Sequence, residues 1–367
     1  MILFLIFAIM KHSEFTQLLM QWHMQKNTRQ MPWKGEKDPY KIWLSEVILQ
    51  QTRVEQGWSY YEKFIKAYPT LAKLANAKDE EVFKLWEGLG YYNRCKNLLY
   101  TARFIVKELN GVFPDEYEKI LSLKGVGPYT ASAIASFAFN KPYAVVDGNV
   151  FRVLSRWFGI DTAIDSAEGI KIFTSLAGKL IDKKNAGLYN QAIMDFGATV
   201  CKPALPLCSA CDLQENCVAH EKRLVNHLPV KEKLLQRKNR WFTWFLFTHR
   251  NKIFVTKRTG KDIWQNLFEF YLVETDEKTE WQTDTINEVL KNQLSIANAD
   301  IVHISPVFSQ QLTHQNIKAV FIKIELSSVP VSLESYTCIG FNDIGKFAFP
   351  GIINQYLQSA SMQSTLF

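Results

Sequence analysis

The hydrophobic period of this chain changes near residue 239, and this change constrains the fold more than any other feature. From Ser13 to about Leu224, apolar residues recur at intervals of three and four, as in FTQLLMQWHM and LAKLANAKDEEVFKLW, which predicts a dense set of helices. Beyond residue 239 the pattern predicts paired strands, with WFTWFLFTHRNKIFVTKR as a hairpin that turns near Asn251. The 367 residues are therefore expected to form two domains of different class.

The second domain is expected to be α+β. VHISPVFSQQLTHQNIKAVFIKIEL indicates another hairpin, and TDTINEVLKNQL, between the two hairpins, indicates a helix. HEKRLVNHLPVKEKLLQRKNR is basic and poor in large apolar side chains, which is typical of a linker. We place the helical domain at residues 10–222, the linker at 223–238 and the second domain at 239–360.

The chain begins with MILFLIFAIM, ten apolar residues without a charge. A membrane span needs about 20 such residues, and a signal peptide normally has a basic start and a small-residue cleavage site. We interpret residues 1–9 as a mis-assigned start or extension, with Met10 opening the protein, and a membrane-directing segment is the alternative. No membrane partner is expected.

Four of the six cysteines fall within CKPALPLCSACDLQENC, with the spacing C-x6-C-x2-C-x5-C. Such clustering indicates a metal or iron-sulfur centre in a reducing compartment rather than a disulfide framework. Structural zinc sites usually pair two C-x2-C units across a longer arm, and one such unit occurs here. The spacing favours a [4Fe-4S] cluster held by Cys201, Cys208, Cys211 and Cys217, with zinc as the alternative.

A glycine turn is the strongest signal for the partner of the chain. The formal charge of +7 suits a polyanion but does not require one. In LKGVGPYTA, Gly125 and Gly127 follow an apolar helix end, and such glycines allow positive φ and close backbone approach. The pattern is neither a P-loop nor a Rossmann turn. A helix-hairpin-helix that holds a DNA phosphate fits better, and an ordinary turn between helices is the alternative.

Several motifs together resemble a known family. LKGVGPYTA, the aspartate of VVDGNV and the cysteine cluster resemble the iron-sulfur branch of the helix-hairpin-helix DNA glycosylases. MPWKG, WLSEVILQQTRV, LWEGLGYYNR and a second domain resemble, within that branch, the MutY family of adenine DNA glycosylases. The resemblance implies a monofunctional enzyme that flips adenine, mispaired with 8-oxoguanine or guanine, out of double-stranded DNA and hydrolyses its N-glycosidic bond. It also implies a monomer with a [4Fe-4S] cluster in the bacterial cytoplasm, nucleoid-associated when engaged on DNA.

The resemblance assigns catalytic roles to four residues. Glu46 matches the glutamate that protonates the leaving base, and its apolar helical neighbours predict a burial that raises its pKa. Asp147 matches the carboxylate that stabilises the cationic sugar, although a helix N-cap alone would also explain it. Asn149 matches a neighbour that positions water and carboxylate. Tyr129 stands where endonuclease III enzymes have a Schiff-base lysine, which predicts hydrolysis without strand cleavage.

The resemblance also implies binding residues. The adenine pocket is matched by Arg29, Trp33, Leu49, Val54, Gln191 and Met194. Contacts with DNA are matched by Gln51, Tyr91, Gly125, Gly127, Thr313 and His314. Gln191 departs from the glutamate of some members. The second domain resembles a MutT-like, Nudix-related domain that reads 8-oxoguanine, but LTH replaces its phenylalanine-serine-histidine triplet. A Nudix catalytic pattern is missing from the sequence, so this domain is expected to bind without chemistry of its own.

Two other functions stay open at this point. A pyrimidine-lesion glycosylase of the endonuclease III type, with lyase activity, would need a lysine nucleophile, and Lys124 or Lys141 would be the candidates. A non-catalytic iron-sulfur DNA-binding protein would make Glu46 and Asp147 dispensable.

Overall fold

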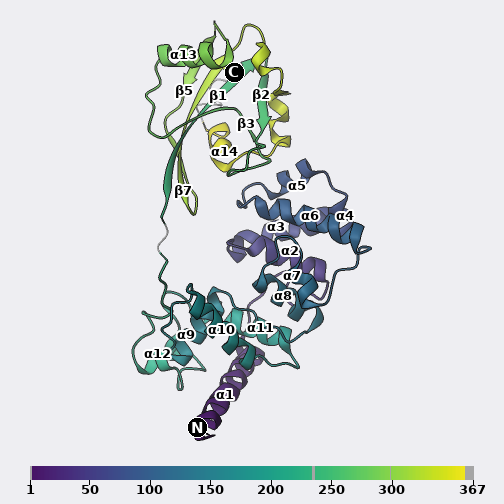
Figure 1. Ribbon diagram of the computed structural model, residues 1–367, viewed down its shortest axis with the longest axis vertical. Coiled ribbons are helices and arrows are strands. Elements are labelled where there is room, and N and C mark those ends of the chain that lie inside the picture. The colour runs from purple at the N-terminus through teal and green to yellow at the C-terminus, as the bar shows by residue number, and fades with distance from the viewer. Residues whose placement is uncertain (1, 234–235, 298, 360–367) are drawn as a thin grey trace. The chain divides into compact units, whose positions relative to one another are not determined.

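The computed structural model describes residues 2–233, 236–297 and 299–359 (Figure 1). The chain divides into two compact units, Met1–Asn76 with Lys96–Lys233 and Ala77–Cys95 with Leu234–Phe367. The short segment Ala77–Cys95 thus groups with the second unit although it lies within the sequence of the first. Within the described residues, no helix has the length and apolarity needed to cross a membrane.

The first unit is helical throughout its described elements, as the sequence period predicted. It contains α1 (Ile2–Lys26), α2 (Pro39–Leu49), α3 (Val54–Ala67), α4 (Leu71–Ala75), most of α6 (Asn93–Glu108), α7 (Tyr117–Leu121), α8 (Pro128–Phe139), α9 (Gly148–Phe158), α10 (Ala167–Leu180), α11 (Ala186–Thr199), η1 (Cys208–Ala210) and α12 (Val218–Glu221). Because α1 begins at Ile2, the apolar start of the chain continues the same helix as the residues after Met10.

An aromatic core joins the two ends of the first unit. Phe15 of α1 packs on Trp157 of α9, and Trp22 of α1 packs edge-on against Phe196 of α11, with ring centroids 4.9 Å apart in both pairs. Burial of each such side chain contributes about 1.5–3 kcal/mol. This core holds α9 and α11 as a rigid frame for the side chains that they carry.

The second unit is built around a sheet whose central pair is parallel. Its elements are α5 (Asp79–Trp86), β1 (Lys238–His249), β2 (Lys252–Lys257), β3 (Phe268–Glu269), β4 (Tyr271–Thr275), α13 (Thr283–Leu294), β5 (Asp300–Ile304), β6 (Phe308–Gln311), β7 (Gln315–Glu325), η2 (Val331–Leu333), β8 (Thr337–Gly340), η3 (Phe341–Lys346) and α14 (Gly351–Leu357). β1 and β7 run parallel from the pair Lys238 and Gln315 to the pair Thr248 and Glu325. β2 and β4 pair antiparallel with β1, and β5 and β6 pair antiparallel with β7.

Both predicted hairpins and the predicted helix between them are present. β1 and β2 are joined through Arg250 and Asn251, which both have positive φ, as the common two-residue hairpin turn requires. β6 and β7 form the second hairpin, and α13 is the helix. The α+β prediction is therefore confirmed, whereas the parallel pairing of β1 with β7 was not anticipated from the sequence.

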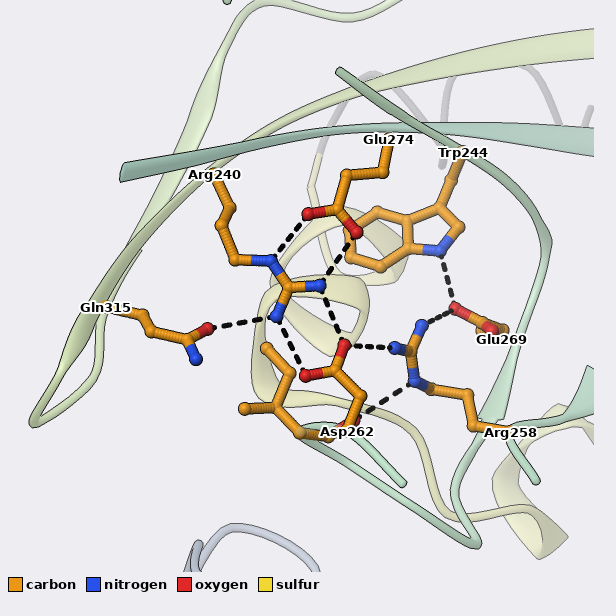
Figure 2. Close-up of polar contacts among 8 residues, drawn as sticks. Arg240, Trp244, Arg258, Asp262, Glu269, Glu274 and Gln315 are labelled. Carbon is orange, nitrogen blue, oxygen red and sulfur yellow. Dashed lines mark hydrogen bonds and ion pairs between the residues drawn. The ribbon is translucent and has the colours of Figure 1, made fainter. Parts of the chain in front are cut away.

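An ion-pair network ties one end of this sheet to a neighbouring loop (Figure 2). Arg240 of β1 donates two hydrogen bonds to Asp262 and two to Glu274 of β4. Arg258 contacts the same Asp262 and also Glu269 of β3. Planar guanidinium groups suit such paired contacts with carboxylates, so the network gives this loop a defined position.

Candidate active site

A cavity of about 420 Å³ lies among α2, α3, α8, α9 and α11 of the first unit. It is lined by every residue that the sequence analysis assigned to catalysis or to the adenine pocket. These are Glu46, Tyr129, Asp147, Asn149, Arg29, Trp33, Leu49, Val54, Gln191 and Met194. The structure thus brings together side chains that are far apart in the sequence, in a space of the size that small-molecule sites have.

Glu46 lies in the buried part of α2 and is 5% exposed. The helix begins at Pro39, and the side chain of Asp38 caps it by accepting a hydrogen bond from Tyr40 N at 2.9 Å. Burial raises the pKa of Glu46 to about 7; a hydrogen bond with Tyr129 lowers it, and the Asp147 carboxylate raises it. The predicted rise is confirmed. A carboxyl group of this kind keeps its proton in a large share of molecules at neutral pH.

Asp147 is the N-cap of α9, as the structural alternative predicted. Its Oδ1 accepts hydrogen bonds from Asn149 N at 2.9 Å and Val150 N at 2.8 Å, and its Oδ2 accepts one from Asn149 Nδ2 at 2.7 Å. Burial raises the pKa of Asp147, and these hydrogen bonds oppose the rise. Capping and a place in the cavity wall coexist, because the capping loop itself forms part of that wall.

Tyr129 is half-buried in the first turn of α8. Burial raises its pKa well above the usual value, and the nearby carboxylates of Glu46 and Asp147 raise it further. The phenol therefore keeps its proton and can donate it in a hydrogen bond to Glu46.

Two arginines of α9, one turn apart, connect the Asp147 loop with the cysteine segment. Arg152 donates from Nη2 to Asn149 Oδ1 at 2.8 Å and from Nε to the carbonyl oxygen of Cys201 at 2.7 Å. Arg156 donates from Nη1 to Cys201 Sγ at 3.5 Å. The sequence analysis missed both residues, although their spacing of four in NVFRVLSRW places them on one helix face.

The four predicted cluster cysteines line a second cavity of the first unit, beside Trp157 and Phe196. Burial raises the pKa of Cys208, Cys217 and Cys211, the last to about 12. These thiols would therefore ionise together only beside a compensating cation.

Across the described ranges, no three His, Cys, Asp or Glu side chains are placed to hold a metal ion. The placement of the four cysteines therefore does not distinguish zinc from a cluster, and the preference for a cluster comes from their spacing in the sequence.

The two glycines of the predicted hairpin differ. The turn lies between α7 and α8, and Gly125 has φ +82°, where an added Cβ would lie 2.7 Å from Asn97 Cβ. Gly127, the N-cap of α8, has an ordinary φ of −98°, and an added Cβ would face open space. The backbone and the packing therefore require glycine at position 125, while position 127 leaves free room in front of the helix N-terminus.

The other predicted DNA contacts lie on turns. Gln51 is exposed after α2, with φ +56°. Within the second unit, Tyr91 is 44% exposed, and its hydroxyl group hydrogen bonds to Thr313 Oγ1. His314 is exposed at the turn between β6 and β7. The predicted triplet at residues 312–314 thus lies at a hairpin tip, where Leu312 and Thr313 are half-buried and His314 is exposed.

Comparison with known proteins identifies both parts of the chain. The HhH-GPD superfamily of base excision DNA repair proteins matches residues 44–176, and a NUDIX domain matches residues 243–359. Relatives named adenine DNA glycosylase include one from Buchnera aphidicola subsp. Acyrthosiphon pisum, 36% identical over 70% of this chain and 73% of the relative. Another, from Buchnera aphidicola subsp. Baizongia pistaciae, is 31% identical over 89% and 91%, and one from Homo sapiens is 42% identical over 57% and 40%.

Solved structures share the fold of the helical part. A thermostable thymine-DNA glycosylase matches with a TM-score of 0.54 and 30% identity, over 58% of this chain and 97% of that chain. A trapped covalent complex of endonuclease III with DNA matches with a TM-score of 0.50 and 22% identity, over 58% and 98%. The second likeness shows a common fold.

Proposed function

This chain belongs to the adenine DNA glycosylase family, and from that premise we propose that it removes adenine paired with 8-oxoguanine or guanine in double-stranded DNA. It is an adenine DNA glycosylase of base excision repair, a hydrolase of the N-glycosidic bond. The observation that carries the proposal is the convergence of Glu46, Tyr129 and Asp147 on one cavity.

In the proposed reaction, the adenine leaves the base stack and enters this cavity. Leu49, Val54 and Met194 offer apolar surface there, and the indole of Trp33 is held edge-on by Tyr61 with ring centroids 5.3 Å apart. The proton of Glu46 passes to a ring nitrogen of adenine as the bond to C1′ breaks, and the bonding electron pair leaves with the base. The base therefore departs neutral.

Loss of the base leaves a positive charge on the sugar. The Asp147 carboxylate, held by the N-terminus of α9, stabilises that charge, and Asn149 orients the attacking water. The water oxygen bonds to C1′, and the proton that it loses restores Glu46 for the next turnover. The products are free adenine and an abasic sugar.

Strand cleavage is not part of the proposal, because the cavity holds no free amine nucleophile among its described residues. Lys34 Nζ donates to the carbonyl oxygen of Arg29 at 2.6 Å, and Lys37 Nζ donates to that of Phe137 at 3.0 Å. Lys124 stacks over the ring of Tyr100 and Lys141 pairs with Asp115 at 3.4 Å, and neither lines the cavity. We therefore propose that the enzyme is monofunctional, with glycosylase activity and without lyase activity.

We propose that Cys201, Cys208, Cys211 and Cys217 hold a [4Fe-4S] cluster. When bound, the cluster supplies cross-links that fasten the segment 201–217, and no reaction step passes through it. Iron and sulfide analysis, with visible absorption, tests this assignment against zinc. Four iron atoms per chain support it, and stoichiometric zinc without iron overturns it.

The proposed domains divide the work on DNA. Residues 10–222 hold the adenine strand, with the amides beside Gly125 and Gly127 facing a phosphate. Residues 239–360 follow the linker 223–238, and the tip with Thr313 and His314 reads the opposite base. The protein acts as a monomer in the bacterial cytoplasm, on the nucleoid.

Single-turnover release of adenine from duplexes with 8-oxoguanine, guanine, cytosine or thymine opposite adenine tests the function. We expect the fastest release opposite 8-oxoguanine, then guanine, with abasic but uncut strands. Glu46→Gln should abolish release, while the matched variant Glu55→Gln, at an exposed site on α3, should retain it. Equal rates on all four duplexes, or activity in Glu46→Gln, would contradict the proposal.

A further inference from the structure

Asp195 is a buried carboxylate directly behind the wall of the adenine cavity. It lies on α11, one turn after Gln191, and is fully buried. Its Oδ1 accepts hydrogen bonds from Gln191 Nε2 and from Arg29 Nη1, both at 2.9 Å. Its Oδ2 accepts one from Asn27 Nδ2 at 2.8 Å and lies 3.3 Å from Lys34 Nζ. Gln191, Arg29 and Lys34 line the cavity, and Asp195 stands behind them.

The contact with Asp195 decides which end of the Gln191 amide faces the cavity. A carboxylate paired with cations offers acceptors alone, so it holds the amide nitrogen and leaves the amide oxygen to point elsewhere. Gln191 Oε1 has no hydrogen-bond donor among the residues that the structure describes. Gln191 therefore presents an open acceptor to a ligand in the cavity.

Arg29 stands beside this acceptor and has donors alone. Both groups are anchored on the same Asp195 oxygen, so they stay side by side. A flipped adenine carries an amino donor at C6 next to the acceptor N1, which complements such a pair. A 6-oxopurine carries the opposite order, an acceptor at C6 next to an N1–H donor. Its acceptor would face the acceptor oxygen of Gln191, and its donor would face the donor groups of Arg29.

We propose that Asp195 is a positioning residue that makes the cavity select a 6-aminopurine over a 6-oxopurine. It does so by fixing the orientation of the Gln191 amide and the place of the Arg29 guanidinium. This inference rests on the proposed assignment of the cavity to adenine. It predicts a change of base selectivity, which a merely structural aspartate would not produce.

The test compares single-turnover release of adenine and of hypoxanthine, each opposite 8-oxoguanine, in Asp195→Asn and the unaltered protein. The new side chain can donate toward Gln191, which frees that amide to rotate and present its nitrogen. We expect the adenine-to-hypoxanthine rate ratio to fall about 10- to 100-fold. Asp115→Asn, the same substitution at an exposed aspartate that does not line the cavity, is the matched control, and its ratio should stay unchanged.

A double variant that exchanges the carboxylate and the amide provides a second test of the role of Asp195. In Asp195→Asn combined with Gln191→Glu, the new amide donates to the new carboxylate, whose second oxygen again offers an acceptor to the cavity. The ratio should recover toward that of the unaltered protein. If Asp195→Asn does not fold, Gln191→Leu is the variant to measure, because it removes the acceptor while Asp195 and Arg29 stay paired. The adenine-to-hypoxanthine rate ratio should then fall.

The outcomes separate this inference from the proposed function. An unaltered protein that releases no adenine would refute the function itself. An unaltered protein that releases adenine, with a ratio that stays the same in Asp195→Asn or in Gln191→Leu, would overturn the role of Asp195 alone. Thermal unfolding of each variant shows whether the fold has been kept.

Discussion

The hydrogen bond between Tyr129 and Glu46 predicts a measurable shift in the pH dependence of adenine release. Glu46 must carry a proton to donate it, and its pKa is about 7. The single-turnover rate should therefore be high below pH 7 and fall about tenfold for each pH unit above it. Tyr129→Phe removes the hydrogen bond that lowers this pKa, so the pKa of Glu46 should rise and the falling limb should move to higher pH.

The size of the shift follows from the energy of that bond. A hydrogen bond to a charged group contributes about 1.5–3 kcal/mol, and a pKa change of one unit corresponds to about 1.4 kcal/mol. The limb should therefore move upward by about one to two pH units. The rate at its plateau should also fall, because Tyr129 lies against the reacting centre.

The assay measures release of adenine opposite 8-oxoguanine with enzyme in excess, from pH 5.5 to 9. Tyr143→Phe, at an exposed tyrosine stacked on Tyr117, is the matched control and should keep the limb near pH 7. A limb that stays in place or moves to lower pH in Tyr129→Phe would refute the reasoning. So would a limb that appears in any residual activity of Glu46→Gln.

Three further predictions concern stability and binding. Because the pKa of Glu46 is raised on folding, its ionisation costs stability as pH rises through 7; Glu46→Gln should therefore be more stable than the unaltered protein at pH 8, by on the order of 2–3 kcal/mol in denaturant unfolding. Gly125→Ala should lower the melting temperature, since φ +82° costs alanine about 1–2 kcal/mol, whereas Gly127→Ala should leave the melting temperature unchanged and weaken duplex binding in fluorescence anisotropy; equal effects of the two would contradict the hairpin argument. Arg152→Met removes the donors that hold Asn149 and the Cys201 carbonyl oxygen. Adenine release should slow about tenfold or more at temperatures at which the variant is still folded.

The local elements of the fold were predictable because their signals are local. The helical period from Ser13 to Leu224, the hairpin turn at Asn251 and the helix from Thr283 each depend on residues within one or two turns of one another. The capping role of Asp147 likewise requires the helix that follows it and little else. Sequence patterns carry such information directly, since neighbours along the chain are neighbours in space.

The membership of the site was predictable to a large extent through motif resemblance, whereas its supporting residues were not. Motif resemblance indicates all ten residues that were assigned to catalysis and to the adenine pocket, and all ten line the cavity. Asp195, Arg152 and Lys34 were missed, because each acts on a partner from another segment or through a buried contact. Spacing alone does not distinguish such residues from polar residues on a solvated helix face.

By itself, the sequence determined the two domain classes, the order of the elements and the chemical types of the candidate groups. The tertiary structure alone decided the parallel register of β1 with β7, the difference between Gly125 and Gly127, and the extent to which burial raises the pKa of Glu46, to about 7. It also decided that Asp195 turns the Gln191 amide. Register, burial and amide orientation depend on contacts between segments that are distant in the chain. These contacts, and the free energies that they contribute, form only when folding brings the segments together.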